Sequence, residues 1–468
     1  MNFNKKLIVF ITIISVVFFI LVGFDVSPFL RGPGEWPPNW RWPYRFTNTL
    51  NKAWLPLLFI FLIIIIGYYF DKQKEIKFKN KLPLILIILV FVTYFFQLSV
   101  IFFSRSGISV LVHQIINPNL NGYFTEAIKI KNLGEFLTNY QKNVLSFSMH
   151  AKGHLPGSIL LFWLIEKITY IIPFINKLTE SLSPKHYDVK LIWDNLTLNQ
   201  KSGAILSTFF IPFLSSLNII PIFFIAKIIY GYKTAIRSLL LTIFLPALTL
   251  FVPVSDVFFP IFFLYSFLFF IDGLKKENTI LIFISGLIFS LGIFFSLSIL
   301  PTLIIFTYYL LKNKIQVKIF LSYFSLGILV PYLILFLIFK FNIISLVLTL
   351  LNGQYSGRHY LIWTIFNLYD FFVFVGLPIT VVYLCIFLKK KADFLAISFT
   401  LMLLLLNFSG IVRAEVGRIW LPLMFPLIII ASKFLTENLK ISIKLFLWIL
   451  FLQAIQILVM QEFWIMLY

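Results

Sequence analysis

The sequence predicts an all-α polytopic membrane protein, and three observations indicate this class. The 468 residues are 60% hydrophobic and only 12% charged, whereas soluble proteins carry about 25% charged residues. Apolar runs of about 17–25 residues recur along the chain, each long enough to cross a hydrocarbon core of about 30 Å as a helix. These runs lack the alternating pattern of outer-membrane barrel strands. We therefore expect a bundle of apolar helices without a soluble domain.

The apolar runs define about thirteen transmembrane helices in a single integral membrane domain that covers residues 1–468. The first run follows Lys5 and Lys6 and has no small-x-small cleavage site, so we expect a retained helix rather than a signal peptide. The single cysteine, Cys385, lies inside an apolar run and is expected to be a packing residue. The predicted spans are 7–24, 54–70, 82–103, 204–229, 237–252, 257–274, 279–296, 299–311, 319–338, 370–388, 394–411, 419–433 and 441–462.

Lysines cluster in alternate loops, and this pattern predicts the orientation in the cell membrane. Basic loops face the cytoplasm by the positive-inside rule, which places the N-terminus there as well. The net charge of +21 then reflects helix-end lysines near anionic lipids, and no nucleic-acid partner is expected. The basic loops are 72–81, 227–237, 275–276, 312–318, 389–391 and 433–440.

The other polar intervals are therefore predicted on the periplasmic or extracellular face. Within the longest interval, the apolar piece 157–174 is interrupted by Glu166, Lys167 and Pro173. A membrane-spanning helix here would invert every later loop, so we expect a helix lying at the interface. Short amphipathic helices are predicted at 124–130 and 135–140. The intervals are a first outer loop at 25–53, a long outer loop at 104–203, a cover loop at 340–369, the stretch 412–418 and a turn at Asp256.

The segment from His150 to Trp163, HAKGHLPGSILLFW, resembles the His-Pro-Pro-containing segment of GT-C superfamily glycosyltransferases. It is most similar to the family 39 and lipid A aminoarabinose transferase-like branch, which uses polyprenyl-phosphate sugars. The segments NGYFTEAIKI, VPVSDVFFP and RAEVGRIWLPLMFP are similar to further features of that family, in the same order. The resemblance extends from about residue 104 to about residue 430.

This resemblance implies a GT-C-type bundle with interfacial helices in the long outer loop. It also implies transfer of a sugar from a polyprenyl-phosphate donor to a lipid, glycan or protein acceptor on the outer face. Two departures from the family pattern stand out. The His-Pro-Pro motif reads His154-Leu155-Pro156, and the acidic pair before the short helix is replaced by Asn119 and Asn121. Because asparagine does not act as a base, the catalytic carboxylate must lie elsewhere.

Such a transfer needs a general base to deprotonate the acceptor and a cation to stabilise the departing phosphate. The candidate bases are Asp256, Asp25, Glu35 and Glu126. Asp256 lies at a membrane boundary, where an unpaired carboxylate is costly. Helix capping competes with catalysis as the role of Asp256 and Asp25, and solvation on a polar helix face competes for Glu35 and Glu126.

The candidate phosphate-binding residues centre on Arg413 and Arg418, which flank Glu415 directly before a predicted span. Arginine contacts phosphate oxygens in bidentate fashion and keeps its charge, although a structural Arg–Glu pair is the alternative. The other candidates for this role are Arg358, His359 and Lys152.

The remaining candidates are predicted to line the substrate site: Tyr123, His150, His154, Glu415, Arg31 and Arg41. His150 and His154 are four residues apart, but the sequence offers no obvious third ligand, so no metal site is predicted and a divalent cofactor stays an open alternative. Trp36, Trp40 and Trp42 are candidates for stacking on a sugar, with membrane anchoring as the alternative.

Two rival functions stay open. A transporter or flippase of lipid-linked sugars would place broken helices and charges near the midplane, whereas the charges here are predicted in outer loops. A non-catalytic protein of the same fold is the second rival, because Asn119 and Asn121 replace the acidic pair.

Overall fold

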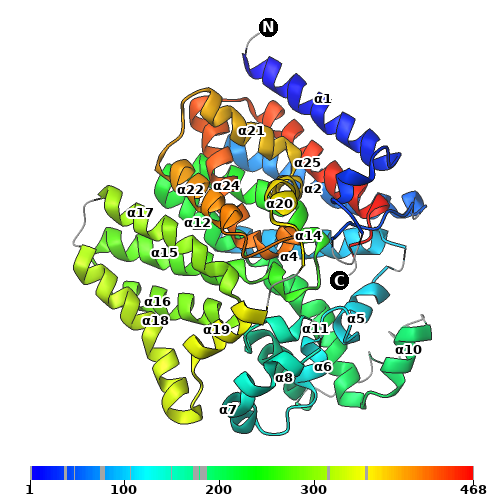
Figure 1. Cartoon of the computed structure of the whole chain (residues 1–468). Coiled ribbons are helices and arrows are strands. Elements are labelled where there is room, and N and C mark those ends of the chain that lie inside the picture. Colours follow the sequence, from blue (N-terminus) through cyan, green and yellow to red (C-terminus); the bar gives the residue numbers. More distant parts are fainter. Residues whose placement is uncertain are drawn as a thin grey trace.

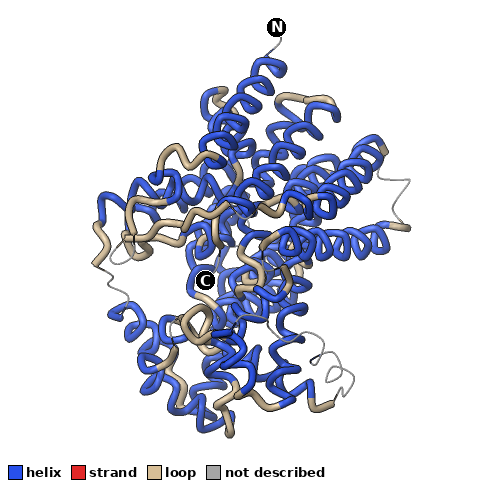
Figure 2. Tube along the Cα trace, turned by 90° about the vertical axis from the view of Figure 1, so that its right-hand side faces the viewer, coloured by secondary structure: helices blue, strands red, loops and turns tan. Residues whose placement is uncertain are grey.

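The structure is a computed structural model that describes residues 3–35, 39–46, 48–73, 80–105, 107–148, 150–171, 179, 187–313, 317–353 and 357–466. Throughout these ranges the regular elements are helices, joined by loops and by one isolated antiparallel bridge between Tyr44 and Trp464 (Figures 1 and 2). The predicted all-α class is therefore confirmed.

Eight helical segments in the described part of the chain are long and apolar enough to cross a membrane. The least buried are α1 (Phe3–Gly23), α2 (Trp54–Lys72) and the span Leu321–Phe339 of α18 (Val317–Phe339), in which only 17–33% of residues are buried. Helices that expose mostly Leu, Ile and Phe require an apolar surrounding. The others are α4 (Leu82–Phe103), α11 with α12 (Leu198–Ser216, Ile219–Tyr230), η5 with α15 (Ser255–Val257, Pro260–Lys276), α24 with η7 (Leu421–Lys433, Phe434–Asn438) and α25 (Ile443–Phe463).

The predicted number of about thirteen spans is not confirmed, because five predicted spans are shorter or broken. The run 237–252 is split at Pro246, since a residue before proline disfavours the helical conformation. Apolar composition alone does not separate such short buried helices from spans. The five runs correspond to α13 and α14 (Tyr232–Ile243, Pro246–Leu250), α16 (Thr279–Phe295), η6 with α17 (Leu297–Thr302, Leu303–Asn313), α20 with α21 (Tyr360–Val375, Leu377–Leu388) and α22 (Phe394–Ser409).

A sharp break separates α20 from α21, which meet at an angle of 113°. The predicted helix at 370–388 is therefore wrong: α20 begins ten residues earlier, and the chain turns at Gly376. Gly376 has φ +104°, and a Cβ there would lie 1.9 Å from Gln453 Nε2, so only glycine fits. If this pair counts as one broken span, the described residues contain up to nine spans.

Two buried glutamines of α25 hold the broken backbone. Gln456 Oε1 accepts a hydrogen bond from the Leu377 amide at 2.8 Å, and its Nε2 donates to the Val373 carbonyl at 2.8 Å. Gln453 Nε2 donates to the Val375 carbonyl. Because unpaired backbone groups are costly in an apolar environment, these side chains replace the helical hydrogen bonds lost at the break.

The polar loops gather at two ends of the molecule. At one end, here called the lysine end, Asn4 bonds to the Leu439 carbonyl, and Lys389 lies over the Phe3 ring. The buried Arg237 pairs there with Asp71, with Nε 2.8 Å from Oδ1. These residues belong to or adjoin the loops that the lysine pattern predicts on one side. The predicted basic loops 72–81 and 312–318 lie partly outside the described residues.

The opposite end, here called the loop end, contains the helices of the predicted long loop (Figure 1). The predicted helices 124–130 and 135–140 correspond to α6 and α7, and the predicted interfacial helix corresponds to α8, with its predicted end at 172–174 outside the described residues. The predicted cover loop 340–369 is instead largely helical. The elements are α5 (Ser109–Ile116), α6 (Tyr123–Ala127), α7 (Leu133–Asn143), η3 (Val144–Ser146), η4 (Ala151–Gly153), α8 (Gly157–Thr169), α10 (Tyr187–Asp194) and α19 (Ile343–Gly353).

We predict that Gln456→Leu lowers the thermal unfolding midpoint of the detergent-solubilised protein by several degrees. The substitution leaves a buried N–H and a buried C=O without partners, each at a cost of about 1–3 kcal/mol. Gln453→Leu, which removes one described hydrogen bond instead of three, is expected to have a smaller effect. The matched control is Gln461→Leu on the same helix, whose side chain makes no hydrogen bond that the structure describes. Equal midpoints for all three variants would contradict this role.

Candidate functional site

A buried charge network lies at the loop end between η5 and α23 (Val416–Ile419). Asp256 and Arg418 are each only 3% exposed, and Arg418 NH1 lies 3.8 Å from Asp256 Oδ2. Arg418 NH2 also donates to Glu415 Oε2 at 2.8 Å, and Glu415 Oε1 lies 3.4 Å from Arg358 NH2. Two carboxylates and two guanidinium groups therefore share one buried region, where an unpaired charge would be strongly destabilising.

Local backbone geometry presents Glu415 and Arg418 to this region. Ala414 and Glu415 both have positive φ values, 83° and 60°, which non-glycine residues adopt only when surrounding contacts hold them. Asn367 of α20 supplies such contacts, since its Oδ1 accepts from the Ala414 amide at 3.1 Å and its Nδ2 donates to the Val412 carbonyl at 2.8 Å. The Gly417 amide donates to Asp370 Oδ2 at 3.0 Å. Helix α20 therefore fixes the 412–418 loop.

Tyr123, His150 and His154 complete the site from the long loop. Tyr123 is buried, and its ring contacts the His154 imidazole edge to face, with centroids 5.4 Å apart. The backbone of His154 is held by Tyr140, whose hydroxyl donates to the His154 carbonyl at 2.8 Å. The charges of Asp256 and Arg418 act on all three titratable side chains, which therefore lie close to the ion pair.

The site keeps these three side chains neutral near pH 7. Burial lowers the pKa of His150 well below its ordinary value, and the Arg418 guanidinium lowers it further. Burial also lowers the pKa of His154, against an opposing effect of Asp256. Burial and the Asp256 charge raise the pKa of the Tyr123 phenol well above its ordinary value. Each neutral imidazole therefore offers one N–H donor and one acceptor.

Several buried polar atoms on or close in sequence to the site residues Tyr123 and Asp256 lack a hydrogen-bond partner among the described residues. They are the Tyr123 hydroxyl, the Ser255 hydroxyl and both polar atoms of the Asn121 side chain. A buried polar group without a partner costs about 1–3 kcal/mol, and native proteins contain few of them. Such atoms are candidate contacts for a polar ligand.

The other predicted residues that the structure describes make contacts outside the ion-pair network or are exposed. Glu126 is buried and accepts from Lys129 at 2.9 Å and from the Ser148 amide at 3.0 Å, so it joins α6 to the loop before η4. Arg413 donates to the Arg358 carbonyl at 2.7 Å. Lys152, His359 and Asn119 are exposed. His186 and Trp36 lie outside the described residues.

The predicted residues of the first loop form a separate cluster. Arg31 binds both carboxylate oxygens of Asp25 at 2.8 Å and donates to the Trp42 carbonyl at 2.6 Å. Arg41 donates to the Gly32 carbonyl at 3.2 Å, and Glu35 is exposed. The structure therefore brings Asp256, Arg418, Glu415, Arg358, Tyr123, His150 and His154 together, and it describes Asp25 as the partner of Arg31 instead.

Sequence reasoning missed Asn367 and Asp370, which position the 412–418 loop. A signal was present, because a carboxylate inside an apolar run is a functional candidate by default. The predicted helix at 370–388 made Asp370 look like a helix end, which hid this signal. No group of three or more His, Cys, Asp or Glu residues suited to a metal ion occurs in the part of the chain that the structure describes.

The fold and the apolar spans define the chain as an all-helical membrane protein with a polar site at one end. The sequence matches no protein-family model and no curated protein.

We predict that Arg418→Gln raises the pKa of His150. The guanidinium lowers this pKa in the native protein, and its removal leaves Asp256, which acts in the opposite direction. Histidine NMR of labelled protein in detergent measures the change, with Lys152→Gln as an exposed control. A His150 titration unaltered by Arg418→Gln would contradict the arrangement.

Because both histidines bind fewer protons when folded, the native state is also expected to lose stability as pH falls below about 6.5.

Proposed function

We propose that the chain is a membrane glycosyltransferase that moves a sugar from a polyprenyl-phosphate donor to a lipid, glycan or protein acceptor. The observation that carries this proposal is the buried Asp256–Arg418 pair, surrounded by two neutral histidines and a tyrosine hydroxyl. A buried carboxylate beside a guanidinium offers the base and the phosphate ligand that such a transfer requires. The family resemblance of the His150–Trp163 segment points to the same chemistry.

In this proposal Asp256 accepts the proton of the acceptor hydroxyl. The hydroxyl oxygen then forms a bond to the anomeric carbon, while the bond from that carbon to the phosphate oxygen breaks. The electron pair of the broken bond leaves with the polyprenyl phosphate. Arg418 contacts this phosphate, exchanging part of its interaction with Asp256 and Glu415 for the stronger charge of the leaving group. His150, His154 and Tyr123 donate hydrogen bonds to sugar or phosphate oxygens.

The orientation is part of the same proposal. Lysine-rich loops meet at the lysine end, and the candidate site lies at the loop end. With the lysine end in the cytoplasm by the positive-inside rule, the site faces the periplasm or the cell exterior. A polyprenyl-phosphate donor fits such a site, because its lipid chain remains in the bilayer while its phosphate reaches the boundary.

The broken helix favours one second candidate function, transport or flipping of a lipid-linked sugar. Discontinuous helices with polar groups near the break are typical of transporters, and α20 and α21 form such a pair with Asp370 on α20. Transporters also tend to show paired halves, and a second bent pair is not found among the described helices. The glycosyltransferase proposal therefore uses more of the observed polar groups.

We predict that Asp256→Asn reduces sugar transfer by about 10²- to 10⁴-fold, the usual effect of losing a general base. The assay uses purified protein, a panel of labelled polyprenyl-phosphate sugars and membrane extract as acceptor. Asp272→Asn is the matched control, because Asp272 pairs with the exposed Lys276 near the far end of α15, the helix that follows η5. Arg418→Lys is expected to weaken donor binding.

Two outcomes would contradict the proposal. Full transfer activity in folded Asp256→Asn would exclude this residue as the base. An inactive wild-type protein that moves lipid-linked sugars across proteoliposome membranes would favour the transporter instead.

A further inference from the structure

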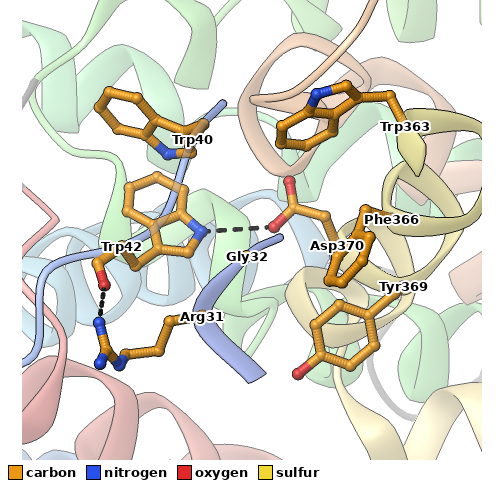
Figure 3. Close-up of a pocket in the computed structure, with 8 residues that line it drawn as sticks. All are labelled: Arg31, Gly32, Trp40, Trp42, Trp363, Phe366, Tyr369 and Asp370. Atoms are coloured by element: carbon orange, nitrogen blue, oxygen red, sulfur yellow. Dashed lines mark hydrogen bonds between the residues drawn. The ribbon is translucent and has the colours of Figure 1, made fainter. Parts of the chain in front are cut away.

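A cavity at the loop end is lined mainly by aromatic rings, together with an arginine and an aspartate (Figure 3). The cavity opens to the surface, and its space is about 240 Å³ when the part open to solvent is included. Its enclosed part is therefore well below the usual range of about 300–1,000 Å³ for small-molecule pockets. Its size therefore suits the head group of a ligand rather than a whole ligand. The lining that matters here consists of Arg31, Trp40, Trp42, Trp363, Tyr369 and Asp370.

The cavity is negatively charged. Arg31 and Asp370 are the charged residues of its lining, and Arg31 is neutralised by its bidentate pair with Asp25. Asp370 forms no ion pair with any residue that the structure describes. Nearby, Arg358 is offset by Glu415 at 3.4 Å. The uncompensated charge is therefore the carboxylate of Asp370, which has to be satisfied in a largely apolar environment.

The Asp370 carboxylate is held in place but keeps acceptor capacity. Trp42 Nε1 lies 3.4 Å from Oδ1, and the Gly417 amide donates to Oδ2 at 3.0 Å. An ionised carboxylate offers about four acceptor positions, so these two contacts leave others for a ligand. Figure 3 shows the carboxylate directed toward Trp42 and lying between Trp40 and Trp363.

Aromatic rings form the rest of the lining. Trp40 and Trp42 meet at 90°, with centroids 5.8 Å apart, so they present two differently oriented surfaces. The Tyr369 hydroxyl donates to the Leu30 carbonyl at 2.7 Å, which fixes this ring against the first loop. The faces of tryptophan rings attract cations, and the Arg358 guanidinium already lies 5.8 Å from the Trp363 centroid.

We propose that this cavity binds an organic ammonium group, carried either by a lipid head group or by a small solute. An uncompensated carboxylate surrounded by tryptophans suits a cation that combines an apolar body with N–H donors. An anion is disfavoured by Asp370. A neutral sugar would stack on the rings but would leave the carboxylate uncompensated. This inference does not depend on the glycosyltransferase proposal.

We predict that methylammonium binds the full-length protein in detergent and that Asp370→Asn weakens this binding by about tenfold or more, since the variant removes the carboxylate that is uncompensated in the described lining of the cavity. Intrinsic tryptophan fluorescence measures binding, with sodium chloride and methanol as ionic and neutral references. Asp272→Asn is the control carboxylate variant and is expected to bind like wild type. Trp40→Leu, which leaves both described Asp370 hydrogen bonds intact, is expected to weaken binding roughly twofold to thirtyfold.

A comparison of two lipid compositions distinguishes a lipid head group from a small solute as the source of the ammonium group. In nanodiscs that contain phosphatidylethanolamine, methylammonium is expected to bind more weakly than in phosphatidylglycerol nanodiscs if the lipid head group occupies the cavity. Equal binding in both assigns the cavity to a solute. No saturable binding in detergent, an equal response to methanol, or unchanged affinity in both Asp370→Asn and Trp40→Leu would overturn the proposal.

Discussion

The break between α20 and α21 is the feature on which the loop end depends. A helix interrupted in an apolar environment leaves backbone groups without partners, and here Gln453 and Gln456 of α25 supply them. The break ends α20 at Gly376 and turns the chain by 113°. Helix α20 then presents Asn367 and Asp370 to the 412–418 loop, and this loop carries the charged residues of the candidate site.

Charge compensation explains why the loop end is assembled from distant parts of the chain. Arg418 lies between Asp256 and Glu415, while Arg358 lies on the far side of Glu415. Each of these groups would be costly alone in a buried position, so pairing with a neighbour lowers the cost of burying each one. Substitution of any one of these four residues is therefore costly, because it leaves the charge of a neighbouring residue uncompensated.

The candidate site and the ammonium cavity share the 412–418 loop. The Gly417 amide contacts Asp370, which lines the cavity, while Arg418 next to it contacts Asp256. A Cβ on Gly417 would lie 2.3 Å from the Phe374 ring, so the loop packs closely against α20. Gly417 therefore contacts the cavity and its neighbour Arg418 contacts the ion pair, so the two places are joined by adjacent residues of one loop.

The sequence by itself determined the class of the protein and most of its helices, because apolar runs of membrane length have few alternatives to helical structure. It also indicated Asp256 and Arg418 beside predicted span ends, and the two histidines in the long outer loop, as candidate site residues. Only the tertiary structure decided that these residues meet, that Asp25 pairs with Arg31, and that α20 is broken before α21. Those outcomes depend on side chains such as Gln456 and Asn367, whose partners lie far away in the sequence. No local pattern encodes such pairings, since each polar group takes whichever partner the packed helices bring within reach.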